Sequence, residues 1–153
     1  MTMGPATSSD DVRSLQIETA FGAFTVDPDA VVRFPSGLPG FEQSREFVVL
    51  SSSEIAPFSC LHSVSGPSAS FLVIDPRAVL DDYRCALSLA DLQRLAVSDD
   101  RALLWLAIVS VDDLGQACAN LRAPIAINPQ RMLGSQVMPH NSLYPLRHPL
   151  PFE

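Results

Sequence analysis

His62 and Asp75 are the side chains of this 153-residue chain whose types could together support acid–base chemistry. Placed around an enclosed pocket, they would form the centre of a small enzyme or of a ligand-binding β-barrel. His62 lies in phase with Phe58, Cys60 and Val64, on the side of a predicted strand that faces the core. A histidine at such a position is more often half-buried and hydrogen-bonded than catalytic. We therefore predict that the protein is not an enzyme, and we keep His62 with Asp75 as the alternative.

Other signatures of catalytic and metal sites are missing from the sequence. It has no nucleophile elbow, no glycine-rich phosphate loop and no histidine or cysteine spacing typical of metal ligands. Its three cysteines form no CxxC pair, which indicates buried free thiols and not a disulfide or zinc framework. Adjacent carboxylates on a strand point to opposite faces, so they suit turns better than an acid–base dyad; these pairs are Asp81-Asp82, Asp99-Asp100 and Asp112-Asp113. We expect no catalytic residue, no metal ligand and no cofactor.

Charge and hydropathy narrow the classes of partner. The net charge is −7, and the ten basic residues are all arginines that are scattered singly. Binding to nucleic acid needs clustered cations, so no direct nucleic-acid partner is expected. An acidic surface suits a basic protein partner, although the same charge also serves solubility alone. The longest apolar run is well short of the ~18 residues of a membrane helix, and the N-terminus lacks a secretory signal. We predict a cytoplasmic protein without a membrane partner.

The elements that must position these residues are short strands separated by turns. Thirteen prolines mark breaks along the chain, because proline cannot donate to a central ladder. Runs of β-branched and aromatic residues predict strands near residues 15–18, 24–26, 31–34, 47–50, 58–64, 71–74, 102–111, 116–121, 124–128 and 135–138. The nearly all-apolar run 102–111 predicts a strand buried on both faces. One short helix is predicted over residues 88–97, with Ser88 as its N-cap and Asp91 in its first turn.

Taken together, these elements predict one all-β domain with a single short helix, arranged as an antiparallel barrel or sandwich. Residues 1–12 lack an apolar cluster and are predicted to form a disordered N-terminal tail. Residues 13–153 are predicted to form the domain, and no internal repeat or second domain is visible.

Two irregular segments have unusual compositions. Residues 34–42 (FPSGLPGFE) place two prolines, two glycines, two phenylalanines and a leucine in nine positions. Such a stiff apolar segment either folds back as a lid on the core or displays its side chains to a partner, and both interpretations stay open. Residues 119–129 (ANLRAPIAINP) contain a strand bracketed by Asn120 and Asn128. Asparagines bond their own backbone at strand ends, so a structural role is favoured for both.

Together with residues 75–76 (DP) and 144–150 (YPLRHPL), these segments make an ordered set of motifs that resembles the bacterial flagellar assembly factor FliW family. The resemblance extends over almost the whole chain. It implies a compact antiparallel β-barrel-like fold and a protein that binds and antagonises the translational repressor CsrA, so that flagellin mRNA is translated. It also implies binding of flagellin in competition with CsrA, which would couple flagellin synthesis to secretion and filament assembly.

Interface hot spots are enriched in aromatic and arginine anchors, so side chains within these motifs are predicted to contact the partner. The predicted apolar anchors are Phe34, Leu38, Pro39 and Phe41. The predicted polar contacts are Asn120, Asn128, Arg147 and His148. A third hypothesis is a dedicated flagellin chaperone that lacks the CsrA arm, and it is suggested by a turn at residues 112–115 that is shorter than is usual in the family.

Overall fold

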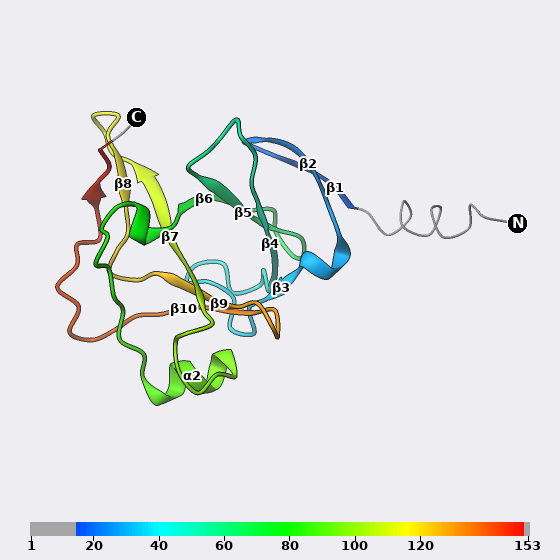
Figure 1. Cartoon of the computed structure of the whole chain (residues 1–153). Coiled ribbons are helices and arrows are strands. Elements are labelled where there is room, and N and C mark those ends of the chain that lie inside the picture. Colours follow the sequence, from blue (N-terminus) through cyan, green and yellow to red (C-terminus); the bar gives the residue numbers. More distant parts are fainter. Residues whose placement is uncertain (1–14, 152–153) are drawn as a thin grey trace, which may run out of the picture.

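The computed structural model describes residues 15–151 and consists mainly of β-strands with one α-helix (Figure 1). This confirms the predicted fold class. The tail predicted at residues 1–12 lies outside the described residues. The elements are β1 (Leu15–Thr19), β2 (Gly22–Val26), the 3-10 helix η1 (Pro28–Ala30), β3 (Val32–Arg33), β4 (Glu46–Leu50), β5 (Ser59–Ser63), β6 (Ser70–Ile74), the 3-10 helix η2 (Pro76–Ala78), α2 (Leu89–Leu95), β7 (Leu104–Val111), β8 (Ala117–Ala119), β9 (Ile125–Asn128), β10 (Leu133–Gln136) and β11 (His148–Pro149).

Seven of these strands close into a barrel. Their order is β7-β6-β5-β4-β3-β10-β9, and β9 pairs back onto β7. Neighbours run antiparallel except β3 and β10, which are parallel where Leu133 lies opposite Arg33. Closure removes the free lateral edges that would otherwise recruit another strand. A protein partner must therefore meet the ends of the barrel, its outer face or the segments attached to it.

Strand β7 has two partners in succession on one edge. Its first half pairs with β9 and its second half with β8, which also pairs with β11. Leu106 lies opposite Ile125 of β9, and Val109 lies opposite Ala119 of β8. These positions are three residues apart along β7 but six residues apart along the segment that joins β8 and β9. The extra residues form a bulge loop at residues 120–124, which leaves the ladder between β8 and β9.

The prediction that residues 102–111 are buried on both faces holds for the middle of β7 and is wrong at its ends. Leu106 and Ile108 pack against the barrel core, while Trp105 and Ala107 belong to two other buried clusters. Leu104 and Val111 are 55% and 65% exposed. The apolar composition of the run does not show where the covering layers stop.

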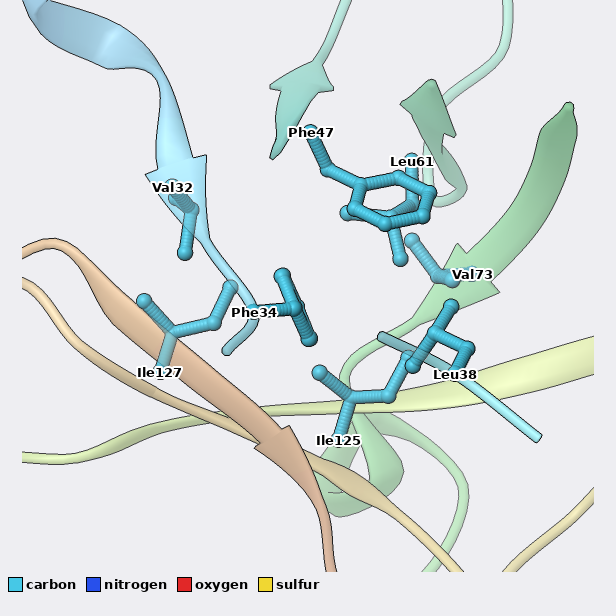
Figure 2. Close-up of a cluster of buried hydrophobic side chains, with 8 residues drawn as sticks. All are labelled: Val32, Phe34, Leu38, Phe47, Leu61, Val73, Ile125 and Ile127. Atoms are coloured by element: carbon cyan, nitrogen blue, oxygen red, sulfur yellow. The ribbon is translucent and has the colours of Figure 1, made fainter. Parts of the chain in front are cut away.

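The core of the barrel is a cluster of eight buried side chains, shown in Figure 2: Val32, Phe34, Leu38, Phe47, Leu61, Val73, Ile125 and Ile127. The rings of Phe34 and Phe47 meet edge to face with centroids 5.1 Å apart. Gly134 on β10 makes room for Phe34, because a Cβ at that position would lie 2.5 Å from the ring. The Phe34 ring and the glycine backbone therefore fit each other closely.

Two elements cover the outside of the barrel. The β1–β2 hairpin packs Ile17 against a cluster that includes Val48 and Leu50 of β4. Helix α2 packs Leu95 against a cluster that includes Trp105 of β7. The helix begins where predicted: the Ser88 hydroxyl accepts from the Asp91 amide, and the Asp91 carboxylate accepts from the Ser88 amide.

Candidate functional site

Residues 34–42, called the plug loop below, close one part of the barrel core. Phe34 and Leu38 are buried in the core cluster, so their predicted role as displayed apolar anchors is wrong. The loop folds back because its own backbone turns: the Gly37 amide donates to the Phe34 carbonyl at 2.8 Å. Gly37 has φ +67°, and a Cβ there would lie 2.7 Å from the Glu42 Cα. For these two side chains the lid interpretation is correct.

The tip of the plug loop is exposed. Pro39 is exposed, and Phe41 is 40% exposed while its ring stands at 90° on Phe71, with centroids 5.0 Å apart. The Glu42 carboxylate accepts from the Gly40 amide at 3.0 Å, and this backbone hydrogen bond lowers the pKa of Glu42. The tip therefore presents an aromatic ring beside a fixed negative charge, and Pro39 and Phe41 remain available to a partner.

The two asparagines predicted as polar contacts have structural roles. Asn128 is buried; its amide nitrogen donates to the Leu95 carbonyl at 2.8 Å, and its oxygen accepts from the Gln130 amide. Its predicted role as a partner contact is therefore wrong, since both ends of its side chain tie β9 to neighbouring segments. Asn120 is half-buried, and its oxygen accepts from the amides of Arg122 and Ala123, which shapes the bulge loop.

Arg147 and His148 lie next to the bulge loop. Arg147 is exposed and His148 is half-buried in β11, where it pairs with Ala119, the neighbour of Asn120. The structure thus brings together three predicted polar contacts, Asn120, Arg147 and His148. Among the described residues, no recorded hydrogen bond or ring contact joins this group to the tip of the plug loop.

The motifs at residues 119–129 and 144–150 meet at Tyr144. The Arg122 guanidinium donates to the Tyr144 carbonyl at 2.9 Å, and the Leu121 amide donates to the Pro145 carbonyl at 3.2 Å. The Tyr144 ring packs on Tyr83 with centroids 4.6 Å apart, and the Tyr83 hydroxyl donates to the Leu121 carbonyl. These contacts hold the segment at residues 137–147, called the strap below, against the body of the protein.

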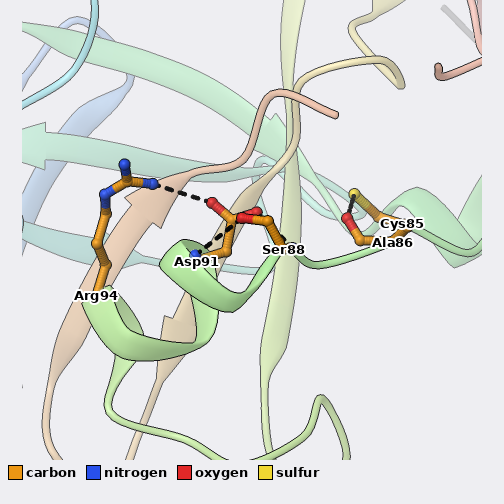
Figure 3. A network of polar contacts seen from close by, with 5 residues as sticks. All are labelled: Cys85, Ala86, Ser88, Asp91 and Arg94. Atoms are coloured by element: carbon orange, nitrogen blue, oxygen red, sulfur yellow. Dashed lines mark hydrogen bonds and ion pairs between the residues drawn. The ribbon is translucent and has the colours of Figure 1, made fainter. Parts of the chain in front are cut away.

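A groove of about 990 Å³ lies between the strap and helix α2. One wall is formed by residues 84–88 and the first turn of α2, and the other by residues 138–144 of the strap. Figure 3 shows the polar network of the first wall, in which Arg94 donates to the Asp91 carboxylate at 3.1 Å. Burial and the nearby Asp91 charge raise the pKa of the Cys85 thiol to about 11, so this groove thiol is protonated near neutral pH.

Sequence reasoning missed this groove. One signal was present in the sequence: residues 83–88 (YRCALS) alternate between apolar and polar or small side chains, as a half-buried strand does. The strap has no comparable pattern, and its position depends on contacts with Tyr83, Arg122 and Leu121, which are distant in the sequence.

The alternative site at His62 and Asp75 is not assembled. His62 lies opposite Ser70 at the start of β6, and its Nδ1 is 2.6 Å from the Ser70 hydroxyl. Asp75 follows the end of β6 and caps η2 by accepting from the Arg77 amide. The two positions are separated by the length of β6, roughly 16 Å at the usual rise per residue. Burial lowers the pKa of His62, as expected for a packed histidine.

Within residues 15–151, no group of three or more His, Cys, Asp or Glu side chains is placed to hold a metal ion. No helix in that range has the length and apolar character needed to cross a membrane.

Comparison with known proteins relates nearly all of the described residues to one family. A family model described as FliW protein matches residues 16–150. The flagellar assembly factor FliW of Geobacter sulfurreducens is 36% identical over 132 residues, which cover 86% of this chain and 82% of the relative. The flagellar assembly factor FliW of Desulfovibrio desulfuricans is 37% identical over 129 residues, covering 82% and 78%. A crystal structure of the flagellar assembly factor FliW matches with a TM-score of 0.79 and 33% identity, and covers 91% of this chain and 99% of that chain.

Proposed function

The chain belongs to the FliW family of flagellar assembly factors, and on this premise we propose that it binds a CsrA-type translational repressor and flagellin in competition. The observation that carries the proposal is the family match over residues 16–150, which includes the plug loop, the bulge loop and the strap. The relatives are named as assembly factors and not as enzymes, which agrees with a binding role.

The regulation proposed is a linked binding equilibrium. When flagellin is scarce, the protein holds the repressor and flagellin mRNA is translated. When unsecreted flagellin accumulates, it occupies the protein, the repressor is released, and translation falls. The net charge of −7 suits binding to a protein and disfavours direct contact with the mRNA. The proposal places the protein in the cytoplasm, where that mRNA is translated.

Five of the predicted contact residues remain in the proposal. Pro39 and Phe41 lie at the exposed tip of the plug loop, and Arg147 is exposed beside the half-buried Asn120 and His148. An exposed ring held by an edge contact loses little conformational entropy when a partner covers it. Phe41 is therefore the apolar anchor that we propose, and Arg147 is the polar one.

The proposal is tested by affinity capture with the tagged full-length protein from a lysate of a flagellated bacterium, with and without accumulated flagellin. The expected result is capture of the repressor when flagellin is scarce and its replacement by flagellin when flagellin accumulates. Purified components then test whether added flagellin displaces the repressor.

Other outcomes of this experiment are also decisive. Recovery of neither partner would overturn the proposal. Recovery of flagellin but never of the repressor would instead support the dedicated chaperone, whose suggested marker is the turn at residues 112–115. In the structure that turn is closed by its own hydrogen bonds, because the Asp112 carboxylate accepts from the amides of Leu114 and Gln116.

A further inference from the structure

Residues 83–88, called the open strand below, have the burial pattern of a β-strand but no strand partner. Tyr83 is buried, Cys85 and Leu87 are half-buried, and the three residues between and after them are exposed. The segment belongs to no ladder in the described part of the chain. The seven strands of the barrel have no free lateral edge, whereas this strand-like segment beside them is unpaired.

The backbone of the open strand has free hydrogen-bonding capacity. The Arg84 amide donates to the Tyr144 hydroxyl, and the Ser88 amide donates to Asp91. Between them, the amides of Cys85, Ala86 and Leu87 make no recorded hydrogen bond to another described residue. In an extended segment the Cys85 and Leu87 amides point to one edge and the Ala86 amide to the other, so an added β-strand would pair with Cys85 and Leu87.

The opposite wall of the groove offers apolar contacts. Leu143 on the strap is 98% exposed and Met138 is 53% exposed, and both line the groove. The strap is tied down on either side of this stretch, by Val137 donating to the Pro124 carbonyl and by the contacts of Tyr144. Anchored exposed side chains of this kind suit a partner segment that carries apolar residues.

The charge of the groove differs from that of the whole protein. Its arginines, Arg84 and Arg94, outnumber its one carboxylate, Asp91, in a chain with 17 acidic and 10 basic residues. Asp91 is already engaged by Ser88 and Arg94, whereas Arg84 has no recorded ion pair within residues 15–151. The acidic Asp81 and Asp82 line a second pocket that Arg84 also lines, and neither forms a recorded ion pair with Arg84 among the described residues. An acidic group on a partner would therefore be complementary to Arg84.

We propose that this groove binds an extended segment of a protein partner, which adds as a β-strand to the open strand and carries apolar residues at alternate positions with acidic residues between them. The backbone of the segment would pair with Cys85 and Leu87, its apolar side chains would meet Met138 and Leu143, and a carboxylate would meet Arg84. The inference rests on the proposed function only in requiring a protein partner.

The test uses the full chain and a fluorescent decapeptide of alternating valine and glutamate as the probe, followed by anisotropy. We expect binding that is weakened about tenfold when lysine replaces glutamate in the probe. A probe N-methylated at alternate amides along its pairing edge should bind about tenfold more weakly as well, because it cannot pair with the open strand. Hydrogen exchange should slow at the amides of Cys85 and Leu87, and less at Ala86, when the probe is bound.

Matched variants separate the groove from general surface effects. Arg84→Glu should reverse the preference between the glutamate and lysine probes, whereas Arg131→Glu, at the turn between β9 and β10, should leave it unchanged. Leu143→Asp should weaken binding about tenfold, whereas Leu114→Asp, on a side chain that is 93% exposed at the β7–β8 turn, should have no effect. Thermal denaturation checks that each variant is folded.

The outcomes separate this inference from the proposed function. If the probe fails to bind, or if Arg84→Glu and Arg131→Glu behave alike, the groove inference is overturned, even when affinity capture recovers both partners. If the probe binds as expected while capture recovers neither partner, the groove inference stands and the proposed function fails.

Discussion

The plug loop and the strap are both irregular, proline-containing segments that carry motifs resembling the FliW family, yet they behave in opposite ways. The plug loop places Phe34 and Leu38 at almost zero exposure, and its turns are held by its own backbone hydrogen bonds. The strap leaves Leu143 almost fully exposed. Hydrogen bonds to residues distant in the sequence hold the strap on either side of Leu143. The difference shows that apolar side chains of a motif contribute to stability where they are buried in the barrel core, as in the plug loop. Where they lie outside the core, as in the strap, they are exposed to solvent and to a partner.

The largest expected effect is on the buried side of this comparison. Phe34→Ala should destabilise the protein by about 3–5 kcal/mol, because it removes a fully buried ring and leaves a cavity beside Phe47. Urea unfolding measures the change, and Phe41→Ala is the matched control within the same loop. Equal losses for the two phenylalanines would remove the distinction between the base and the tip of the loop.

The fit between Gly134 and Phe34 gives the next largest effect. Gly134→Ala should cost about 1–3 kcal/mol, since the added Cβ would lie 2.5 Å from the Phe34 ring. Combining it with Phe34→Leu should recover part of that loss, so the two changes should be non-additive in a double-mutant cycle. Strict additivity would show that the ring moves aside without cost.

Phe41→Ala tests the exposed tip of the plug loop. It should lower the stability by only about 1 kcal/mol, because the half-exposed ring makes one edge contact with Phe71. Binding to the CsrA-type repressor should fall while the melting temperature drops by only about 2–4 °C. A drop of about 10 °C or more with unaltered affinity in the folded protein would assign Phe41 to the core.

Tyr144→Phe tests how the strap is attached. It removes the acceptor of the Arg84 amide and should cost about 0.5–1.5 kcal/mol of global stability. Hydrogen exchange at the Arg84 amide should accelerate more than exchange in the barrel strands, since the strap opens locally. If exchange accelerated uniformly instead, the strap would be part of the same cooperative unit as the plug loop.

The smallest effect concerns Cys85 on the groove wall. Its raised pKa of about 11 means that the folded chain keeps the thiol proton that an unfolded chain loses near pH 9, so this contribution to stability is lost as the pH rises from about 9 to about 11. Alkylation of Cys85, followed by peptide mapping, should be slow at pH 8 and rise toward pH 11. Asp91→Asn should shift this profile to lower pH, and a wild-type profile centred near pH 9 would contradict the assignment.

Much of the fold could be predicted from local chemistry. The capping residues Ser88 and Asp91 marked the helix start, and alternation in the sequence located most of the strands. The two-residue strand β11 was missed, because it forms only through pairing with Ala119 and Cys118. The asparagines show the same limit. A structural role for Asn120 and Asn128 could be predicted from asparagine chemistry, but the hydrogen bond from Asn128 to the Leu95 carbonyl could not, because the two residues are 33 positions apart in the sequence.

By itself the sequence determined the mainly β class, the acidic charge, the absence of recognisable catalytic motifs and the family, because each depends on residue types and their local order. Only the tertiary structure decided which apolar motif residues are buried and which are displayed. Phe34 and Phe41 have the same side chain and lie in one loop. Phe34 is buried in the barrel core, whereas Phe41 is partly exposed and contacts Phe71. The position of the groove also depends on the tertiary structure. Its walls come from residues that are far apart in the chain and are brought together only when the barrel closes.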